Sequence, residues 1–148
     1  MEIVDRVASS LKNVGFEVER KRFDVSTRSS VLAAQALGCT VAEIAKNVVF
    51  SGGGTHVIIL SGEMKVDTGK LSRLVGSEVE LVAPDTVRRS TGYPIGGVPP
   101  FPNRSGVRTA PDHSLERFKQ VWTAGGAPDV VFRVKTDNLL RTIGAGPL

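Results

Sequence analysis

The sequence predicts a single α+β domain with a mixed β-sheet, spanning residues 1–148. Its short strand-like segments are separated by helical segments and hairpins without a strict strand-helix-strand order, which is typical of α+β folds. A chain of this length can bury a sizeable core within one domain. Hydrophobic residues make up 41% of the chain and charged residues 23%, as is ordinary for a globular protein.

The N-terminal segment predicts a helix followed by a strand. Apolar residues recur at helical spacing from Ile3 to Val14, and Gly15 stands where helices commonly end, so we expect a helix over 2–14. Residues 16–19 then alternate in polarity, as a half-buried strand does. Three basic residues are expected at the end of that strand: Arg20, Lys21 and Arg22. Such a run is either a solvated face or a contact for phosphates.

The next segment predicts two helices and a hairpin. A helix over 31–37 is closed by Gly38, and the Thr40-x-x-Glu43 pattern is a capping box that opens a second short helix. We expect Lys46 in the last turn of this helix, where the helix dipole favours a cation and where a lysine can simply cap carbonyls. The hairpin follows, with a strand from 48, a turn over 51–54 and a strand over 55–60.

Similar signals define the remaining elements. Capping residues and apolar spacing predict helices, and runs of β-branched residues predict strands. The expected helices are one capped by Asp67 or Thr68 and ended by Gly76, one opened by Pro84 and ended near Arg88 and Arg89, and one capped by Thr136 or Asp137. The expected strands span 79–82, 107–110, 121–123 and 130–134, with a turn or helical segment over 112–119.

Residues 90–101, with the sequence STGYPIGGVPPF, predict a rigid loop that can present main-chain N–H groups. Proline fixes the backbone, while glycine lets it bend and lets a ligand approach closely. The Gly96-Gly97 pair lies between Pro94 and Pro99, so it forms a stiff frame with bare amide donors. The alternative is an irregular connection without chemistry.

Composition indicates an intracellular, cytoplasmic protein without a membrane partner. No apolar run approaches the ~18 residues needed to cross a bilayer, and the first residues do not resemble a signal sequence. The single Cys39 rules out an internal disulfide and agrees with a reducing compartment. The net charge of +4 gives only mild attraction for a polyanion.

Several kinds of active site are disfavoured. Cys39 would need a base, and His56 in an apolar strand is better explained as a structural residue. One cysteine and two distant histidines do not make a metal site, so we expect neither a metal nor a cofactor. Gly69-Lys70 is followed by Leu71 where a phosphate-binding loop needs Ser or Thr.

Three motifs together resemble the YbaK/EbsC family, whose domain is also associated with prolyl-tRNA synthetases. They are AEIAKNVVF at 42–50, STGYPIGGVPPF at 90–101 and VWTAGGAPDVVFRV at 121–134, and the similarity runs from about Arg28 to the C terminus. The resemblance implies a strongly curved, mixed and mainly antiparallel sheet surrounded by helices. It also implies deacylation of wrongly charged tRNA, notably prolyl-tRNA carrying a wrong amino acid such as Ala or Cys.

An ester of this kind is already activated, so it needs an oxyanion hole, a positioned water or ribose hydroxyl, and phosphate anchors rather than a strong protein nucleophile. We therefore expect a free-standing trans-editing deacylase with aminoacyl-tRNA as substrate, prolyl-tRNA synthetase as a further partner, and no DNA. Two alternatives remain open. One is a non-catalytic module that binds tRNA or a synthetase, and the other is a deacylase for another small acyl ester.

The resemblance implies roles for particular positions. The family lysine falls on Lys46, the loop glycine pair on Gly96 and Gly97, and the later glycine turn on Gly125 and Gly126. The expected substrate-binding aromatics are Phe23 and Tyr93, of which Tyr93 can stack on the terminal base or simply pack. The expected tRNA contacts are Arg20, Lys21, Arg22, Arg88 and Arg89, with Arg104 and Arg108 as further basic positions.

Two positions depart from the family pattern. Pro102 follows Phe101 where the relatives continue with glycine, so the exit of the loop must differ. Ala124 stands where relatives of the bacterial cysteinyl-tRNA type have serine, so a hydroxyl that they can use is missing.

Overall fold

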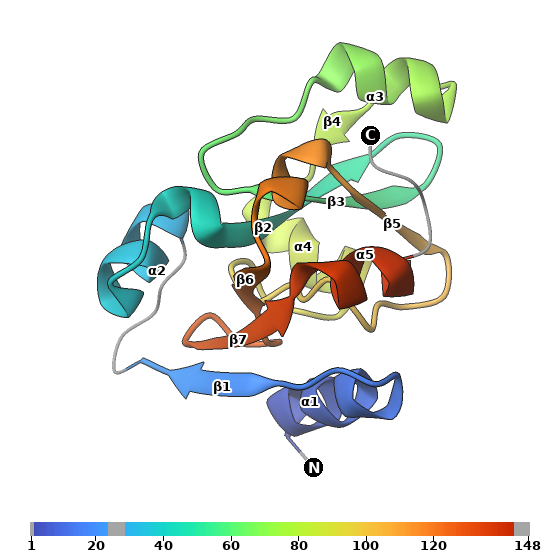
Figure 1. Ribbon diagram of the computed structural model, residues 1–148. Coiled ribbons are helices and arrows are strands. Elements are labelled where there is room, and N and C mark those ends of the chain that lie inside the picture. Colours follow the sequence, from blue (N-terminus) through green and yellow to red (C-terminus); the bar gives the residue numbers. More distant parts are fainter. Residues whose placement is uncertain (1, 24–28, 144–148) are drawn as a thin grey trace.

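Seven strands form one sheet in the computed structural model, which describes residues 2–23 and 29–143 (Figure 1). The strands are β1 (Glu19–Arg22), β2 (Ile44–Ser51), β3 (Thr55–Ser61), β4 (Glu80–Leu81), β5 (Val107–Pro111), β6 (Gln120–Ala124) and β7 (Val130–Lys135). Their order is β1-β7-β6-β2-β3-β5, and β4 pairs with β2 off this path. The β2–β6 and β3–β5 pairs are parallel, whereas the other pairs are antiparallel. The predicted mixed, mainly antiparallel sheet is therefore confirmed.

Helices surround this sheet (Figure 1). They are α1 (Ile3–Asn13), α2 (Ser30–Leu37), α3 (Thr68–Val75), α4 (Pro84–Thr91) and α5 (Thr136–Ile143), with 3₁₀ helices η1 (Val41–Glu43) and η2 (His113–Arg117). The local signals for their ends are confirmed, since Gly38 and Gly76 take the left-handed conformation that ends α2 and α3. The Asp67 carboxylate accepts from the Lys70 N–H and caps α3, as predicted.

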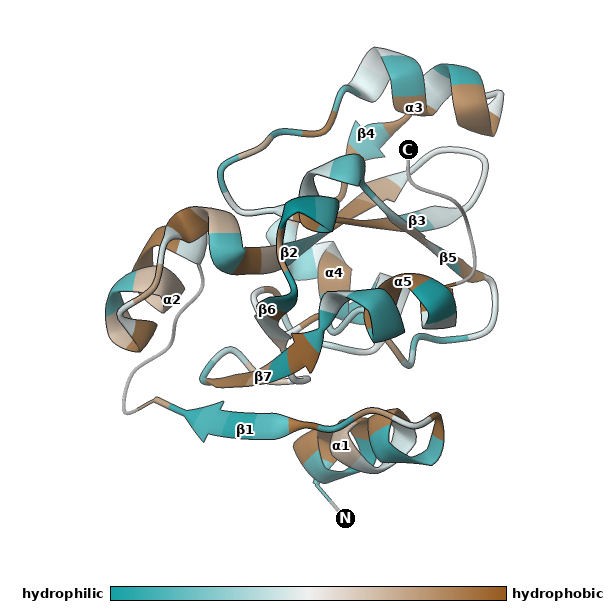
Figure 2. Cartoon of the chain, viewed as in Figure 1, coloured by the Kyte–Doolittle hydropathy of each residue, from teal (hydrophilic) through white to brown (hydrophobic). Residues whose placement is uncertain are grey.

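Strand β2 is the strand on which the three hydrophobic clusters of the described residues meet. Ala45 and Val49 belong to the main cluster, which also takes in residues of α1, α4 and α5. Phe50 packs with Leu71 of α3 in a second cluster, and Ile44 packs with α2 in a third. By contrast, β1 at the edge of the sheet is hydrophilic and exposed throughout (Figure 2). Side chains on β2 are therefore held by packing on several sides.

The strand predicted over 16–19 is wrong in position. The observed strand is β1, which pairs with β7 from Glu19↔Arg133 to Arg22↔Val130. Phe16 is buried and Val18 packs against the main cluster, so their apolar character reflects core packing rather than strand alternation. The basic run consequently lies within a strand and does not follow one.

The prediction that Lys46 lies in a helix is also wrong. The capping box of Thr40 and Glu43 is present, but it opens only the single turn of η1. β2 begins at Ile44, where pairing with Trp122 of β6 and with the end of β3 competes against a helix. Lys46 is therefore a strand residue opposite Leu60, and it caps no helix carbonyl.

Candidate active site

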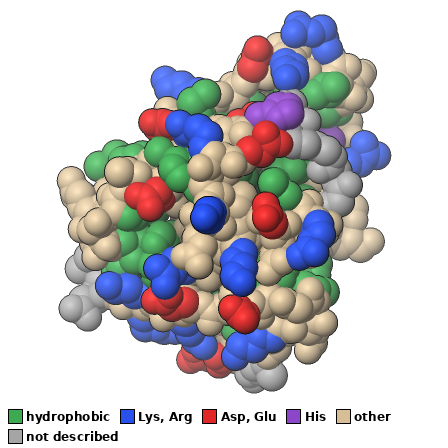
Figure 3. Space-filling model, in the orientation of Figure 1, with side chains coloured by type: hydrophobic (Ala, Val, Ile, Leu, Met, Phe, Trp, Pro, Cys, Tyr) green, Lys and Arg blue, Asp and Glu red, His purple; other side chains and the backbone are tan. Residues whose placement is uncertain are grey.

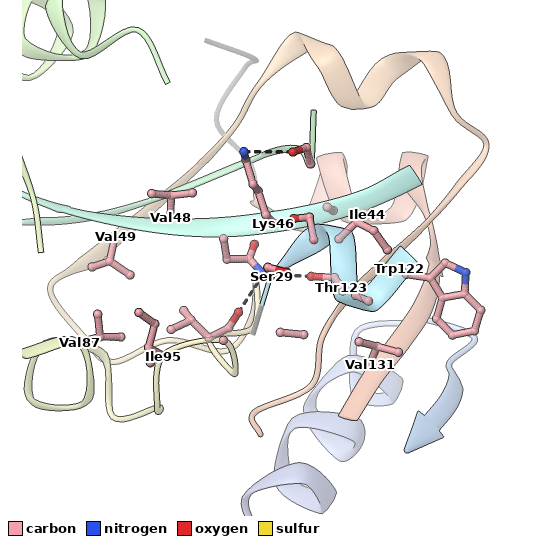
Figure 4. Close-up of a pocket in the computed structure, with 18 of the residues that line it drawn as sticks. Ser29, Ile44, Lys46, Val48, Val49, Val87, Ile95, Trp122, Thr123 and Val131 are labelled. Atoms are coloured by element: carbon pink, nitrogen blue, oxygen red, sulfur yellow. Dashed lines mark hydrogen bonds between the residues drawn. The ribbon is translucent and has the colours of Figure 1, made fainter. Parts of the chain in front are cut away.

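A cavity of about 470 Å³ opens along the edge of β2 that faces away from β3 (Figure 4). On this edge β6 pairs with Ile44 and Ala45, and β4 pairs with Phe50 and Ser51. The stretch between these pairings borders the cavity, which is also lined by α2, α4, the loop after α4, β6 and β7. The site thus exists because two neighbouring strands cover only the ends of β2.

The glycine-rich loop contributes a tight turn to this cavity. The Gly97 N–H donates to the Pro94 carbonyl at 2.9 Å, and Gly96 at the third position of the turn has φ +80°. A positive φ at that position is the mark of a type II turn and favours glycine. Gly96 lines the cavity, and its N–H donates to no acceptor among residues 2–23 and 29–143. It is the kind of bare amide that the sequence predicted.

Gly97 has a different position from its neighbour. Its N–H is used within the turn, and a Cβ at this position would lie 2.9 Å from the Ala127 Cα. The missing side chain lets the loop pack directly on the turn between β6 and β7. Gly97 therefore holds the loop in place and offers no free donor.

Asn47 connects three parts of the cavity wall. Its Nδ2 donates to the Val98 carbonyl at 2.8 Å and to Thr123 Oγ1 at 3.0 Å. Because a carbonyl can only accept, the Val98 contact determines which way the amide points. Neither Asn47 nor the buried Thr123 was among the predicted site residues. Asn47 directly precedes the apolar segment VVF in the predicted strand region. Because Asn is depleted in strands, its amide at this place is the signal that could have revealed it.

Lys46 borders the cavity from another side. Its Nζ donates to the Gly62 carbonyl at 3.2 Å, and Figure 4 shows the side chain extending to the side of β2 opposite Thr123 and Ile95. Alternation along a strand accounts for this, because neighbouring residues point to opposite faces. Burial lowers the pKa of Lys46, and the positive charge of Lys65 lowers it further. Lys46 and Gly96 thus share the cavity without facing each other.

The predicted substrate-binding aromatics lie outside the cavity lining. Tyr93 packs against the main cluster, and its hydroxyl donates to the Pro102 carbonyl at 2.6 Å. Burial raises the pKa of Tyr93, while Arg6 acts in the opposite direction. Phe23 follows β1, and its N–H donates to the Asp129 carbonyl at 2.8 Å. Pro102, the residue that departs from the family pattern, thus supplies the carbonyl that accepts the hydrogen bond of the Tyr93 hydroxyl.

Gly125 and Gly126 serve packing beside the cavity. A Cβ on Gly125 would lie 2.7 Å from the Phe132 ring, and one on Gly126 would lie 3.0 Å from the Ile3 side chain. Both glycines therefore allow close approach of core side chains to the backbone. Ala124, the second departure from the family pattern, does line the cavity. Hydroxyls there come from Ser29, Ser30 and Thr123 instead.

The predicted tRNA contacts form one group on β1 and another on α4, and the arginines of the two groups differ in their ion pairs. Lys21 of β1 has no acidic partner among the described residues. Arg20 pairs with Asp5 at 2.8 Å, and Arg22 lies near both Glu2 and Asp129. Within the described part of the chain, Arg88 and Arg89 of α4 have no acidic partner. The Arg104 guanidinium donates to the Arg89 carbonyl at 2.8 Å and extends this second group. In Figure 3, basic and acidic side chains are interspersed over the face shown.

Two features are absent from residues 2–23 and 29–143. No helix there is both long and apolar enough to cross a membrane. No group of three or more His, Cys, Asp and Glu side chains is placed to hold a metal ion. Cys39 packs beside the α2 cluster, and burial followed by the Glu43 charge raises its pKa, which disfavours the thiolate.

Residues 24–142 match the sequence profile of the aminoacyl-tRNA editing domain. The chain belongs to this family. The match covers all three motifs and the whole cavity lining from α2 to β7. The resemblance to the YbaK/EbsC family is thereby confirmed.

Known proteins agree with this assignment. The editing domain is 34% identical over 107 residues to the uncharacterized protein YwhH of Bacillus subtilis (strain 168), which covers 71% of this chain and 68% of that protein. The crystal structure of a candidate trans-editing enzyme for prolyl tRNA synthetase superposes with a TM-score of 0.87 at 36% identity, covering 100% of this chain and 96% of the other. The crystal structure of the hypothetical protein APE2540 superposes with a TM-score of 0.88 at 26% identity, and the match covers 99% of this chain and 97% of that chain.

Proposed function

We propose that this editing domain is a free-standing trans-editing deacylase that hydrolyses the ester of misacylated tRNA. Its substrate in this proposal is tRNA-Pro carrying a wrong small amino acid such as Ala or Cys. The observation that carries the proposal is the polar composition of the cavity. The Gly96 N–H, the Lys46 ammonium and the Thr123 hydroxyl are all donors, and the lining as described contains no carboxylate, imidazole or thiol.

Donors without a strong nucleophile suit an activated ester. Water attacks the carbonyl carbon, the bond from that carbon to the ribose oxygen breaks, and a proton from the water ends on the ribose oxygen. Negative charge develops on the carbonyl oxygen during the attack, and a preorganised N–H stabilises it. Gly96 offers such an N–H at the cavity surface, since it has no acceptor among the described residues. This chemistry requires no metal ion.

Lys46 supplies the positive charge at the cavity wall. An ammonium has three hydrogens, and the Gly62 carbonyl is the only acceptor for Nζ within the described part of the chain. The other hydrogens remain for an anion, which in an aminoacyl-tRNA is the terminal phosphate. Arg88 and Arg89 then contact the phosphates of the tRNA body, because no carboxylate among the described residues competes for them.

The similarity to a candidate trans-editing enzyme for prolyl tRNA synthetase supports the choice of tRNA and of prolyl-tRNA synthetase as a partner. It also supports work in the cytoplasm, where tRNA is charged.

The test is a panel of aminoacyl-tRNAs incubated with the purified protein, with loss of the ester scored for each. We expect hydrolysis of misacylated tRNA-Pro and little hydrolysis of correctly charged tRNAs. A Lys46→Ala variant that remains folded is expected to lose most of the activity. A protein that binds tRNA yet cleaves none of the esters would instead be a non-catalytic binding module.

A further inference from the structure

Gly62 supplies the carbonyl to which the Lys46 ammonium donates, at 3.2 Å. It directly follows β3, and its N–H donates to the Ile44 carbonyl at 2.7 Å. A Cβ on Gly62 would lie 2.6 Å from the Val41 carbonyl oxygen and 2.8 Å from the Ser30 Cβ, so a side chain fits there only if the backbone moves. Gly62 is thus packed directly against η1 and α2, and the place of the Lys46 ammonium depends on where its carbonyl points.

One guanidinium holds the residues on both sides of Gly62. The Arg117 Nη2 donates to the Ser61 hydroxyl at 3.3 Å and to the Glu63 carboxylate at 2.6 Å. Arg117 ends η2 and lies 56 residues after Ser61 and 54 residues after Glu63 in the chain. Because a single nitrogen joins the two neighbours of Gly62, the peptide groups between them have little freedom to rotate.

The two neighbours of Gly62 differ in what else holds them. Ser61 is fully buried, its hydroxyl donates to the Ala42 carbonyl at 2.7 Å, and its N–H donates to the Ser114 hydroxyl at 3.0 Å. Glu63 is exposed, and within the described part of the chain its carboxylate has Arg117 as its partner. The segment that leaves Gly62 therefore depends on Arg117, whereas the segment that enters it is anchored in the core.

Arg117 is itself anchored on its own element. Its Nε donates to the Ser114 carbonyl at 3.1 Å, and its guanidinium lies 4.9 Å from the Phe118 ring centroid. The side chains of the Arg117–Glu63 pair are 50% and 45% exposed, and ion pairs this exposed contribute little to stability. The main consequence of the pair is thus geometric, since it sets the orientation of the Gly62 carbonyl.

We propose that Arg117 is a positioning residue for Lys46, acting through Glu63 and the Gly62 carbonyl. This inference rests on the proposed function, in which the Lys46 ammonium holds the terminal phosphate. Without the Arg117 contact the Gly62 peptide can rotate, and its carbonyl no longer receives the ammonium in one direction. The remaining hydrogens of Nζ are then no longer directed at the phosphate, and deacylation slows although Lys46 is still present.

The positioning is first tested without substrate, on Arg117→Ala and Glu63→Ala. Glu116→Ala is the matched control, because Glu116 lies in the same 3₁₀ helix and pairs with His113 at 3.4 Å. NMR measures hydrogen exchange of the Gly62 amide and cross-relaxation between the Lys46 ε protons and the Gly62 α protons. In the first two variants we expect roughly tenfold faster exchange and weaker cross-relaxation, and in the control no change.

The effect on turnover is tested by a double-mutant cycle with Lys46→Met under single-turnover conditions. We expect Arg117→Ala to slow the parent about tenfold and to have no further effect in the Lys46→Met background. Glu63→Ala should act in the same way. Since one substitution removes a positive charge and the other a negative charge, altered attraction of tRNA cannot explain a loss common to both. Thermal melting identifies a variant that fails to fold, and the other variant then supplies the answer.

The outcomes separate this inference from the proposed function. If the parent protein hydrolyses none of the aminoacyl esters, the proposed function fails, and the NMR measurements still decide whether Arg117 positions Lys46. Unchanged exchange and cross-relaxation in both Arg117→Ala and Glu63→Ala would overturn the proposal. Equal slowing by Arg117→Ala in the parent and in the Lys46→Met background would overturn it as well, because Arg117 would then act independently of Lys46.

Discussion

Asn47 and Thr123 are joined by a hydrogen bond of 3.0 Å at the centre of the cavity, with Asn47 Nδ2 as donor and Thr123 Oγ1 as acceptor. The same Nδ2 donates to the Val98 carbonyl. One amide therefore connects β2, β6 and the glycine-rich loop. Since accepting this bond leaves the hydroxyl proton of Thr123 available, Thr123 can donate to a bound ester.

Replacing Asn47 with Ala should lower both stability and turnover. The buried Val98 carbonyl would lose its donor, which typically costs about 1–3 kcal/mol in the free energy of unfolding. Thr123→Val is the matched comparison, because it removes the hydroxyl and leaves the Val98 contact intact. We expect a smaller loss of stability with Thr123→Val, measured by urea unfolding, and reduced kcat in both variants. Equal stability of the parent and Asn47→Ala would contradict the connecting role.

Gly96→Ala should reduce single-turnover deacylation by about 10²–10³, because the added methyl group pushes the ester carbonyl away from the N–H of residue 96, with the usual effect of losing one oxyanion contact. Binding of tRNA should be preserved, because phosphate contacts do not involve this turn. Gly96 has φ +80°, so any side chain there also adds backbone strain. Gly106→Ala controls for this strain, since Gly106 has φ +90° and a Cβ there meets nothing within 4 Å. If Gly106→Ala slows deacylation as much as Gly96→Ala does, backbone strain explains the loss of rate, and the contact with the Gly96 N–H does not.

Tyr93→Phe should destabilise the protein without slowing deacylation. The variant keeps the ring in the main cluster and removes the donor to the Pro102 carbonyl, a hydrogen bond whose loss typically costs about 1 kcal/mol. The measurements are thermal melting and deacylation at saturating substrate. A marked rise in KM with unchanged stability would restore the predicted contact between Tyr93 and the terminal base.

Removal of Arg88 or Arg89 should weaken tRNA binding more than removal of Arg20 or Arg22. The α4 arginines have no acidic partner among the described residues, whereas Arg20 is already paired with Asp5. Each phosphate contact that is lost should reduce the slope of log affinity against log salt by about 1. Filter binding of the Arg→Gln variants across a salt series measures this slope. Identical slopes for all variants would argue against any preference for α4.

The amine of Lys46 should lose its proton at a lower pH than an exposed lysine. Burial and the charge of Lys65 both disfavour the ammonium, so the neutral fraction rises earlier as pH increases. Lys65→Met removes the second cause and should move the titration of Lys46 to higher pH, while burial still keeps its pKa lowered. The rate of amine acetylation at Lys46, followed by mass spectrometry against pH, measures this. Lys70→Met is the control. If Lys70→Met shifts the titration of Lys46 and Lys65→Met does not, the assignment of the second cause to Lys65 is contradicted.

Much of the fold follows from signals within a few residues of each element. The capping residues, terminal glycines and helical spacing predicted α1, α2, α3 and α5 close to their observed bounds. The hairpin of β2 and β3 followed from its turn residues, and the glycine and proline spacing predicted the loop in which the turn at Gly96 lies. These features are local because each depends on backbone preferences and near neighbours in the chain.

Tertiary structure decided the arrangement of the candidate site. Lys46 lies in a strand because its segment pairs with β3 and β6, although the capping box before it is real. Arg20 differs from Arg88 because Asp5 happens to lie beside it after folding. Asn47 meets Val98 and Thr123, which are 51 and 76 residues away in the chain. Local patterns carry no information about partners this distant, so the sequence determined which residues are available and the packing of the sheet determined which of them meet.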